Sequence, residues 1–242
     1  MNPPIALVTG GARRIGRHLV CRLHRLGYQL IIHYDNSHAE AEKLVSELNA
    51  KRSGSAESMR ADLSDAEQVL ALANAVKTKE SGLNVLINNA SRFEPDPEPE
   101  DLATARNLLN IHALAPYLLA RTLAEDLAKN SGSIINLIDI YAERPLKQHA
   151  LYSSSKSALH MLTQSLAVEL APHVRVNGIA PGAILWPENG QDAGEQAALL
   201  QKIPLQRLGS VEAIGDTLDY ILRCDYLTGQ IINVDGGRSV TI

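Results

Sequence analysis

The chain lacks several features that define whole classes of protein. It has only two cysteines, Cys21 and Cys224, and they are too far apart in sequence to indicate a metal-ligand motif or a disulfide framework. No apolar run approaches the length of a membrane span, and the strand-like Ile5–Val8 follows Met1 so closely that no signal peptide is expected. These absences predict an unprocessed protein of the reducing cytoplasm with no membrane partner.

An excess of positive charge is also missing. The chain has 23 lysines and arginines against 27 aspartates and glutamates, which gives a formal net charge of −4. Binding to nucleic acid or to an anionic membrane usually needs a basic surface, so neither partner is expected. Aromatic residues make up only 4% of the chain, with one tryptophan and one phenylalanine, whereas hydrophobic residues reach 45%. Such a composition is typical of a parallel sheet covered by helices on both faces.

Short apolar runs alternate with longer amphipathic runs, which indicates repeated strand–helix units and a parallel sheet. The length of 242 residues suits one large α/β domain, and no repeat or linker interrupts it. Six or seven strands are predicted, near Ala6–Thr9, Gln29–His33, Glu57–Ala61, Val85–Asn88, Ser133–Ile138, Arg175–Ile179 and Ile231–Val234. Two segments are predicted to be loops, Arg92–Asp101 and Leu185–Lys202, the second because it contains Gly190 and Gly194. Both follow strands, so they are expected at the rim of a site, because ligands bind beyond the carboxyl ends of parallel strands.

The first predicted strand leads into the sequence TGGARRIG, in which Arg13 and Arg14 stand where a third glycine is expected. Gly10 permits a tight turn, and Gly16 permits close backbone approach at the start of a helix whose N-terminus can face a phosphate. The two arginines would add positive charge beside that phosphate. The alternative is that they are solvated loop residues, because a glycine-rich turn alone is weak evidence.

The end of the second predicted strand should select the nucleotide, since an acidic residue there binds the ribose hydroxyls of NAD. Asp35 favours NAD if its carboxylate points inward. Asn36 and Ser37 can instead donate hydrogen bonds to the extra phosphate of NADP, and Arg13 supplies positive charge to the same corner. These three residues together favour NADPH.

Polar side chains also follow the third and fourth predicted strands. Asp62 and Leu63 are candidate contacts of the adenine, and the sequence Asn88-Asn89-Ala90 can stabilise the edge of the sheet near the cofactor. Ordinary Asx turns remain the alternative for each of these residues.

The sequence YSSSK places Tyr152 and Lys156 four residues apart at the start of an amphipathic run that ends near Ala171. On a helix these two side chains share a face, so a phenol and an ammonium group lie together near the helix N-terminus. Both effects predict a lowered pKa of Tyr152, which would let it give a proton to a substrate atom. The alternative is a surface Tyr and Lys on an ordinary helix.

These motifs occur in a fixed order that resembles the short-chain dehydrogenase/reductase family. TGGARRIG, NNAS, YSSSK, Pro181-Gly182 and the closing VDGG carry the resemblance, which spans essentially the whole chain. It implies a Rossmann-type doubly wound domain with a seven-stranded parallel sheet, a nicotinamide cofactor and usually a homotetramer. It also implies that Ile184 offers backbone groups to the nicotinamide carboxamide and that Lys156 binds the nicotinamide ribose.

Asp139 departs from the general family pattern, which has a serine thirteen residues before Tyr152. A carboxyl group can share protons with a phenol and with ring nitrogens, although a charged one would oppose ionisation of Tyr152. Asp139, Arg14 and Ser91-x-Phe93 resemble the pteridine reductase branch, in which dihydromonapterin reductases also fall. In that branch a phenylalanine like Phe93 stacks on the pterin, a serine like Ser91 bonds the ligand or the cofactor phosphate, and Arg14 reaches both. Without Asp139, packing against a loop would be the better interpretation of Phe93.

Two further residues depart from the family pattern. His112 aligns with the family's active-site asparagine, and it is either a member of a proton relay or a core-facing histidine bonded to a carbonyl group. Asn36 stands where trypanosomatid pteridine reductases commonly have arginine, which weakens the expected preference for NADPH. Leu185 and Trp186 are expected to border the pterin pocket.

The sequence therefore predicts NADPH-dependent reduction of a dihydropterin (dihydromonapterin, dihydrobiopterin or dihydrofolate) to its tetrahydro form. The expected catalytic residues are Asp139, Tyr152 and Lys156. The expected substrate contacts are Arg14, Ser91, Phe93, Asp139 and Tyr152. The expected cofactor contacts are Gly10, Arg13, Arg14, Ile15, Asn36, Ser37, Asp62, Leu63, Asn89, Ala90, Ser91, Tyr152, Lys156, Pro181, Gly182 and Ile184. No metal-ligand spacing is found, so no metal is expected.

Two other functions stay open from the sequence. One is reduction of an ordinary carbonyl, such as a 3-oxoacyl thioester, which Asp139 and Phe93 disfavour. The other is a non-catalytic NADPH-binding sensor with the same fold, which the intact pair of Tyr152 and Lys156 disfavours.

Overall fold

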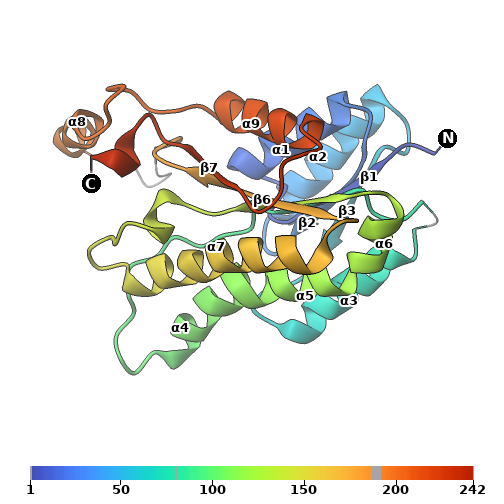
Figure 1. Cartoon of the computed structure of the whole chain (residues 1–242), viewed down its shortest axis with the longest axis horizontal. Helices are drawn as coiled ribbons and strands as arrows, with labels where there is room; N and C mark the ends of the chain where they lie inside the picture. The colour runs from blue at the N-terminus through green and yellow to red at the C-terminus, as the bar shows by residue number, and fades with distance from the viewer. Residues whose placement is uncertain (1, 80, 187–191, 242) are drawn as a thin grey trace.

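One sheet of parallel strands lies between two layers of helices (Figure 1). The computed structural model describes residues 2–79, 81–186 and 192–241. The strands are β1 (Ile5–Val8), β2 (Gln29–Tyr34), β3 (Ala56–Arg60), β4 (Val85–Asn88), β5 (Ser133–Leu137), β6 (Arg175–Pro181) and β7 (Ile231–Val234). They form a 7-stranded sheet in the order β3-β2-β1-β4-β5-β6-β7, and every neighbouring pair is parallel. The predicted Rossmann-type α/β fold is confirmed, and each predicted strand begins at or next to its observed first residue.

Helices cover both faces of the sheet. One layer contains α1 (Arg14–Arg25), α2 (His38–Lys51) and α9 (Val211–Arg223), above the sheet in Figure 1. The other contains α3 (Ala66–Lys77), α4 (Leu102–Leu109), the π-helix η1 (Asn110–Leu114), α5 (Ala115–Thr122), α6 (Ala124–Lys129) and α7 (Ala150–Leu170). Three further elements are helix α8 (Ala193–Gln201) and the short 3-10 helices η2 (Ile140–Ala142) and η3 (Arg238–Val240).

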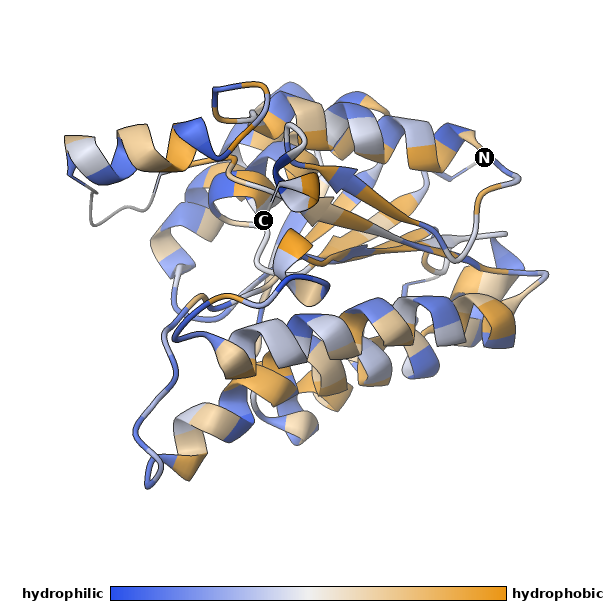
Figure 2. Cartoon of the chain, turned by 60° about the vertical axis from the view of Figure 1, so that its left-hand side comes forward, coloured by the Kyte–Doolittle hydropathy of each residue, from blue (hydrophilic) through white to orange (hydrophobic). Residues whose placement is uncertain are grey.

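The core is divided by the sheet because successive side chains of a strand point to opposite faces. In β1, Ile5 and Leu7 belong to the apolar cluster under α3, α5 and α7, whereas Ala6 and Val8 belong to the cluster under α1, α2 and α9. Apolar colour is accordingly concentrated in the sheet and on the inner helix faces (Figure 2). Within the described ranges, no helix is long and apolar enough to cross a membrane.

The order of the strands reverses between β1 and β4, and this reversal positions the site. The chain first runs outward from β1 to β2 and β3, and then crosses back to place β4 on the other side of β1. Loops that follow the two strands diverge at that point and leave a crevice in which ligands of such sheets bind.

The two predicted loops differ in outcome. Arg92–Asp101 contains no helix or strand, as expected. The prediction for Leu185–Lys202 is wrong in its second half, because α8 begins at Ala193. Asp192 caps that helix by accepting hydrogen bonds from the amides of Gly194 and Glu195 at 2.6 and 3.2 Å. Residues 187–191, which include the predicted loop glycine at position 190, lie outside the described residues.

Candidate active site

The turn between β1 and α1 brings its own backbone into close contact. Gly10 has a φ of +60°, and a Cβ atom on Gly16 would lie 2.2 Å from the Gly10 carbonyl oxygen. Larger residues would therefore strain this turn. The amide of Gly10 donates to Nδ1 of His33 at 3.1 Å, and Nε2 of His33 is hydrogen-bonded to the Ala61 carbonyl at 3.0 Å. Burial lowers the pKa of His33 to about 4, so this neutral histidine fixes the turn.

Asn89 ties the end of β4 to the same turn. Its side-chain amide donates to the carbonyl oxygens of Thr9 and Gly10 at 2.9 and 3.1 Å. The Thr9 hydroxyl group in turn accepts from the backbone amides of Asn89 and Ala90 at 2.9 and 3.0 Å. The ends of β1 and β4 are thereby fixed relative to each other at the point where the strand order reverses.

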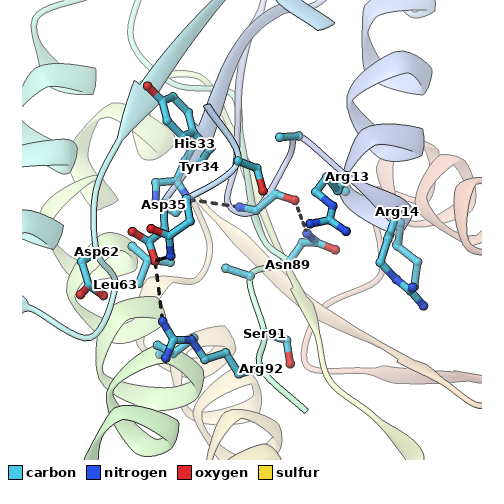
Figure 3. A pocket seen from close by; sticks show the side chains of 18 residues that line it. Arg13, Arg14, His33, Tyr34, Asp35, Asp62, Leu63, Asn89, Ser91 and Arg92 are labelled. Atoms are coloured by element: carbon cyan, nitrogen blue, oxygen red, sulfur yellow. Dashed lines mark hydrogen bonds and ion pairs between the residues drawn. The ribbon is translucent and has the colours of Figure 1, made fainter. Parts of the chain in front are cut away.

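A cavity of about 530 Å³ opens over this turn (Figure 3), a volume within the usual range for small-molecule sites. Its lining includes the predicted cofactor contacts Gly10, Arg13, Arg14, Ile15, Asn36, Ser37, Asp62, Leu63, Asn89, Ala90 and Ser91. Residues that the sequence did not assign also line it, namely Ala12, His33, Tyr34, Arg92 and Ile111. The first residues of α1 face the cavity, so their backbone amides favour an anionic ligand.

The corner of the cavity at the end of β2 carries charges of both signs. Asp35 accepts a hydrogen bond from the Asn36 side chain at 2.8 Å, and its carboxylate lies 3.7 Å from the guanidinium group of Arg92 (Figure 3). Ser37 precedes α2, and its side chain makes no capping hydrogen bond to that helix. Arg13 lines this cavity and a neighbouring hollow between α1 and α2. The carboxylate of Asp35 thus has a cation beside it.

Asp62 lines the cavity and forms an Asx turn at the same time. Its Oδ1 atom accepts from the backbone amide and from the hydroxyl group of Ser64, both at 2.8 Å. The Asp62 amide donates to the side chain of Gln68 at 2.9 Å. The sequence offered the adenine contact and the Asx turn as alternatives. The structure shows the Asx turn, and the adenine contact stays a prediction for a residue that lines the cavity.

A second group of polar residues lies where β5 ends and α7 begins. The Tyr152 hydroxyl group donates to the Asp139 carboxylate at 2.8 Å. Nζ of Lys156 donates to the Leu137 carbonyl at 2.9 Å and lies 5.9 Å from the centroid of the Tyr152 ring. The expected placement of Tyr152 and Lys156 on one face of a helix is therefore found, with Asp139 in contact with the phenol.

The electrostatics of Tyr152 differ from the expectation. Burial, followed by the charge of Asp139, raises the pKa of Tyr152 well above its ordinary value. Burial also raises the pKa of Asp139, and it lowers the pKa of Lys156 to about 8. The prediction of a lowered Tyr152 pKa is wrong for this structure, because the four-residue spacing carries no information about burial. The raised pKa favours the phenol form of Tyr152, whose hydroxyl group donates to Asp139.

Phe93 lies at this second group without being buried. Its side chain is 58% exposed, it stacks on His149 with ring centroids 4.6 Å apart, and it meets Tyr152 edge-on at 4.9 Å. His112 is buried, and its ring also meets that of Tyr152 edge-on, with ring centroids 5.6 Å apart. Its ring bonds to side-chain hydroxyl groups and a backbone amide, and not to the carbonyl group that the sequence offered as one alternative.

Arg14 and Ser91 connect the cavity with the second group. Both line the cavity, and Ser91 also hydrogen-bonds toward Tyr152, which acts to lower the pKa of that phenol. Nη2 of Arg14 donates to the carbonyl oxygen of Trp186 at 3.3 Å, so the glycine turn reaches the segment that follows β6. Ser91 therefore belongs both to the cavity lining and to the surroundings of Tyr152.

The predicted contacts on β6 and after it occupy a different place. Pro181, Gly182 and Ile184 do not line the cavity. The Gly182 amide donates to the Val234 carbonyl at 3.0 Å, and Ile184 is buried against the core cluster under α9. Trp186 is the last described residue before the gap at 187–191. Pro181, Gly182 and Ile184 are therefore outside the cavity lining, and their contacts with the cofactor stay predictions.

Sequence reasoning missed Arg238, which reaches the site from the turn η3. Its guanidinium group donates to the Tyr141 hydroxyl at 2.6 Å and lies 5.3 Å from the centroid of that ring. Tyr141 follows Asp139 by two residues, and its amide donates to the Asp139 carboxylate at 2.9 Å. The positive charge of Arg238 acts to lower the pKa of Asp139, against the effect of burial. No local pattern joins residues 97 positions apart.

Comparison with known proteins adds an independent observation. The profile of the short chain dehydrogenase family matches residues 4–197. Pteridine reductase 1 of Leishmania tarentolae is 34% identical over an alignment that is 281 positions long with its gaps and covers 98% of this chain and 97% of the relative. A dihydromonapterin reductase of Enterobacter sp. (strain 638) is 37% identical, with 96% and 95% covered, and one of Klebsiella pneumoniae is 35% identical, with 98% and 97% covered. Among the described residues, no group of three or more His, Cys, Asp or Glu side chains is placed to hold a metal ion.

Proposed function

Because the chain belongs to the short-chain dehydrogenase/reductase family, we propose that it is an oxidoreductase that reduces a dihydropterin to its tetrahydro form with NADPH. The observation that carries the proposal is the hydrogen bond from Tyr152 to the carboxylate of Asp139 at 2.8 Å. A carbonyl substrate needs one donor at one oxygen. A pterin presents ring nitrogens, with which a carboxyl group can exchange protons and hydrogen bonds.

The residues of the cavity fit a nicotinamide dinucleotide. The glycine turn has no room for a Cβ atom at Gly16, which lets a pyrophosphate approach the N-terminus of α1. Asn89 and His33 hold this turn in place through the backbone of Gly10 and Thr9. When bound, the cofactor supplies a hydride to the substrate.

The phosphate that distinguishes NADPH from NADH is proposed to lie at the corner formed by Arg13, Asn36 and Ser37. All three line the cavity, and Ser37 stands at the N-terminus of α2, where the helix dipole favours an anion. Asp35 opposes this assignment by its charge. The guanidinium group of Arg92, 3.7 Å away, offsets that charge and makes the corner compatible with a phosphate.

The proton for the substrate nitrogen is proposed to come from the pair of Tyr152 and Asp139. Burial keeps Tyr152 in its phenol form and raises the pKa of Asp139, so the pair retains a proton that it can deliver. Lys156 is proposed to bind the nicotinamide ribose, as the family resemblance implies. Arg14 and Ser91 join the cavity to this pair and would contact both ligands.

Phe93 is proposed to cover one face of the pterin ring. Its exposed ring lies beside Tyr152 and is held by His149, so it is positioned at the reacting end of the site. The protein is further proposed to work in the cytoplasm, where the free thiols of Cys21 and Cys224 would stay reduced. A homotetramer is proposed because it is the usual oligomeric state of the family.

The first experiment follows NADPH absorbance with purified protein and, in parallel, dihydromonapterin, dihydrobiopterin, dihydrofolate and an acetoacetyl thioester, each repeated with NADH. We expect oxidation that depends on a dihydropterin and is faster with NADPH. Oxidation with the thioester alone would favour the carbonyl reductase. Tight NADPH binding without turnover of any of these compounds would favour the sensor.

Two substitutions test the assigned proton donors. Tyr152→Phe removes the hydroxyl group and Asp139→Ser removes the carboxyl group, so each is expected to lower pterin turnover about 10²- to 10⁴-fold while NADPH affinity changes little. Tyr220→Phe, a half-exposed tyrosine on α9, is the matched control and should leave turnover unchanged. Unchanged pterin turnover in Asp139→Ser would contradict the role of the carboxyl group.

A further inference from the structure

His112 lies in a widened segment of helix between α4 and α5. The π-helix η1 spans Asn110–Leu114, and π-segments of this kind occur frequently at functional sites. The His112 side chain is 1% exposed, and its ring stands edge-on to that of Tyr152. A buried imidazole needs partners for both of its nitrogen atoms, and these partners determine its chemical form.

The partners of His112 fix its tautomer. Nε2 lies 3.1 Å from the backbone nitrogen of Arg92, which can only donate, so Nε2 is an acceptor without a proton. The Ser91 hydroxyl group also lies within hydrogen-bond distance of the same nitrogen, at 2.9 Å. In a neutral ring Nδ1 must then carry the proton, and it lies 2.7 Å from the oxygen of Ser155.

The chain of hydrogen bonds continues in one direction beyond the ring. The Ser155 hydroxyl group donates to the backbone carbonyl of Tyr152 at 2.7 Å, so its oxygen is free to accept the proton of Nδ1. Every donor from Arg92 to Tyr152 therefore has an acceptor when His112 is neutral. A second proton on His112 would set Nε2–H against the Arg92 amide and break this chain.

We infer that His112 is a neutral positioning residue, which fastens the segment Ser91–Phe93 to helix α7 and thereby sets the Phe93 ring against Tyr152. Nε2 of His112 is hydrogen-bonded to Ser91 and Arg92, the first two residues of the segment. Nδ1 is hydrogen-bonded to Ser155, which lies on α7 about one turn after Tyr152. His112 itself does not line the cavity, but its partners Ser91 and Arg92 do.

The charged surroundings agree with a neutral ring. Burial, together with the positive charge of Lys156 on α7, lowers the pKa of His112 to about 2. The titratable groups that face the ring are the phenol of Tyr152 and the ammonium group of Lys156. Arg92 meets the ring through its backbone, because its guanidinium group lies at Asp35. A proton relay through His112 would need a second proton in this setting.

The tautomer is measured directly by proton–nitrogen correlation spectra of the full-length protein labelled with ¹⁵N-histidine. The spectrum of His112→Gln identifies the signals of His112. We expect a protonated Nδ1 and an unprotonated Nε2 whose shifts stay constant from a pH of about 5.5 to about 8, the range in which an ordinary histidine titrates. His33 is an internal reference of the opposite tautomer, because its Nδ1 accepts from Gly10. Titration of His112 in this range, or a protonated Nε2, would overturn the inference.

The kinetic arm rests on the proposed pterin reductase function. His112→Ala removes both anchors and is expected to raise the KM for the dihydropterin about tenfold, while kcat falls less than about threefold. His112→Gln keeps one acceptor and one donor, and it should restore most of the KM. Ser155→Ala loses only the acceptor of Nδ1–H and supplies a second variant in case His112→Ala does not fold. A large fall in kcat with an unchanged KM would indicate a relay and contradict the inference.

The two arms separate failure of the inference from failure of the proposed function. If the wild-type protein reduces no dihydropterin, the proposed function fails, and the spectra still decide the state of His112. If the protein reduces dihydropterin and His112 titrates, the function stands and the positioning role fails.

Discussion

Lys156 is a cation in the interior of the protein, at 2% exposure. Its folded-state pKa of about 8 lies below its ordinary value of 10.5, so burial of the charged form costs about 3 kcal/mol of stability. That cost applies while the lysine is protonated in both states, and it disappears as the pH rises from about 8 to about 10.5. The group is therefore retained for its role in the site and not for stability.

Lys156→Met is accordingly expected to be more stable than the wild type by up to about 3 kcal/mol near neutral pH, and to lose catalytic activity. This gain in stability should shrink at alkaline pH, where Lys156 is neutral in the folded wild type. Urea unfolding at neutral and alkaline pH measures both effects. Lys77→Met, at an exposed position of α3, is the control. A Met variant that is less stable than the wild type near neutral pH would contradict this account.

The pair of Asp35 and Arg92 gives a prediction about cofactor preference. Removing the cation by Arg92→Ala leaves the carboxylate of Asp35 uncompensated, and NADPH affinity should fall about threefold to tenfold more than NADH affinity. Asp35→Asn should shift the preference toward NADPH, and the double variant should recover most of the loss of Arg92→Ala. Fluorescence titration with each cofactor provides the dissociation constants. Equal effects of Arg92→Ala on both cofactors would show that Arg92 does not act through the phosphate.

Single residues differ in how far the sequence predicts them. The helical spacing of Tyr152 and Lys156 is a local property, and the sequence predicted their contact correctly. The contact of Arg92 with Asp35 and that of Arg238 with Tyr141 join distant segments, and no periodicity reveals them. The pKa of Tyr152 was predicted in the wrong direction because it depends on burial, which only the packed structure defines.

At the scale of elements, helix α7 is capped from outside its own sequence. His149 stands at the N-cap position and makes no side-chain capping bond. Asp96, in the loop after β4, accepts hydrogen bonds from the amides of Ala150 and Leu151 at 2.8 and 2.9 Å instead. The amide of Asp96 also donates to the Gln148 carbonyl at 2.7 Å. The loop and the catalytic helix therefore support each other.

Asp96→Ala should loosen this junction, lower the melting temperature and raise the KM for the dihydropterin, because Phe93 belongs to the same loop. The two amide hydrogen bonds lower the pKa of Asp96, so its stabilising contribution is present above the ordinary carboxyl pKa and is lost as the pH falls through the lowered value. Asp65→Ala, which removes the cap of α3, is the control: it should affect melting and leave the KM unchanged. Equal KM values in Asp96→Ala and the wild type would show that the cap of α7 does not affect the substrate site.

At the scale of the whole molecule, the sequence predicts the sheet well and the loops less well. Central strands such as β1 and β4, which are buried on both faces, appear as short apolar runs, and all seven strands were found with nearly correct bounds. Helix α8 was missed because glycines 190 and 194 indicated a loop, whereas Asp192 supplies a helix start. The Rossmann-type sheet of seven parallel strands was implied by resemblance to a known family, whereas the order of the strands comes from the structure alone.

The proposed homotetramer makes a prediction about exposed apolar side chains. In the layer that contains η1, α5 and α7, Leu114, Tyr117, Met161 and Val168 are 40%, 41%, 60% and 82% exposed. If this layer meets a second copy, Met161→Lys with Val168→Lys should shift the mass measured by light scattering to a smaller species. Tyr226→Lys, a fully exposed position after α9, is the control. A wild-type monomer in solution would contradict the proposal.

Anchors divide the loop after β4 into two unequal parts. His112 holds the beginning and Asp96 holds the end of the part that carries Phe93. Beyond Asp96, residues 97–100 make only short-range backbone hydrogen bonds among the described residues, until Asp101 caps α4 through the amide of Thr104 at 3.0 Å. Inserted residues are tolerated where few backbone contacts would be lost. The chain can therefore lengthen after position 97 to meet a larger substrate tail, while the same insertion before Asp96 would displace the aromatic ring.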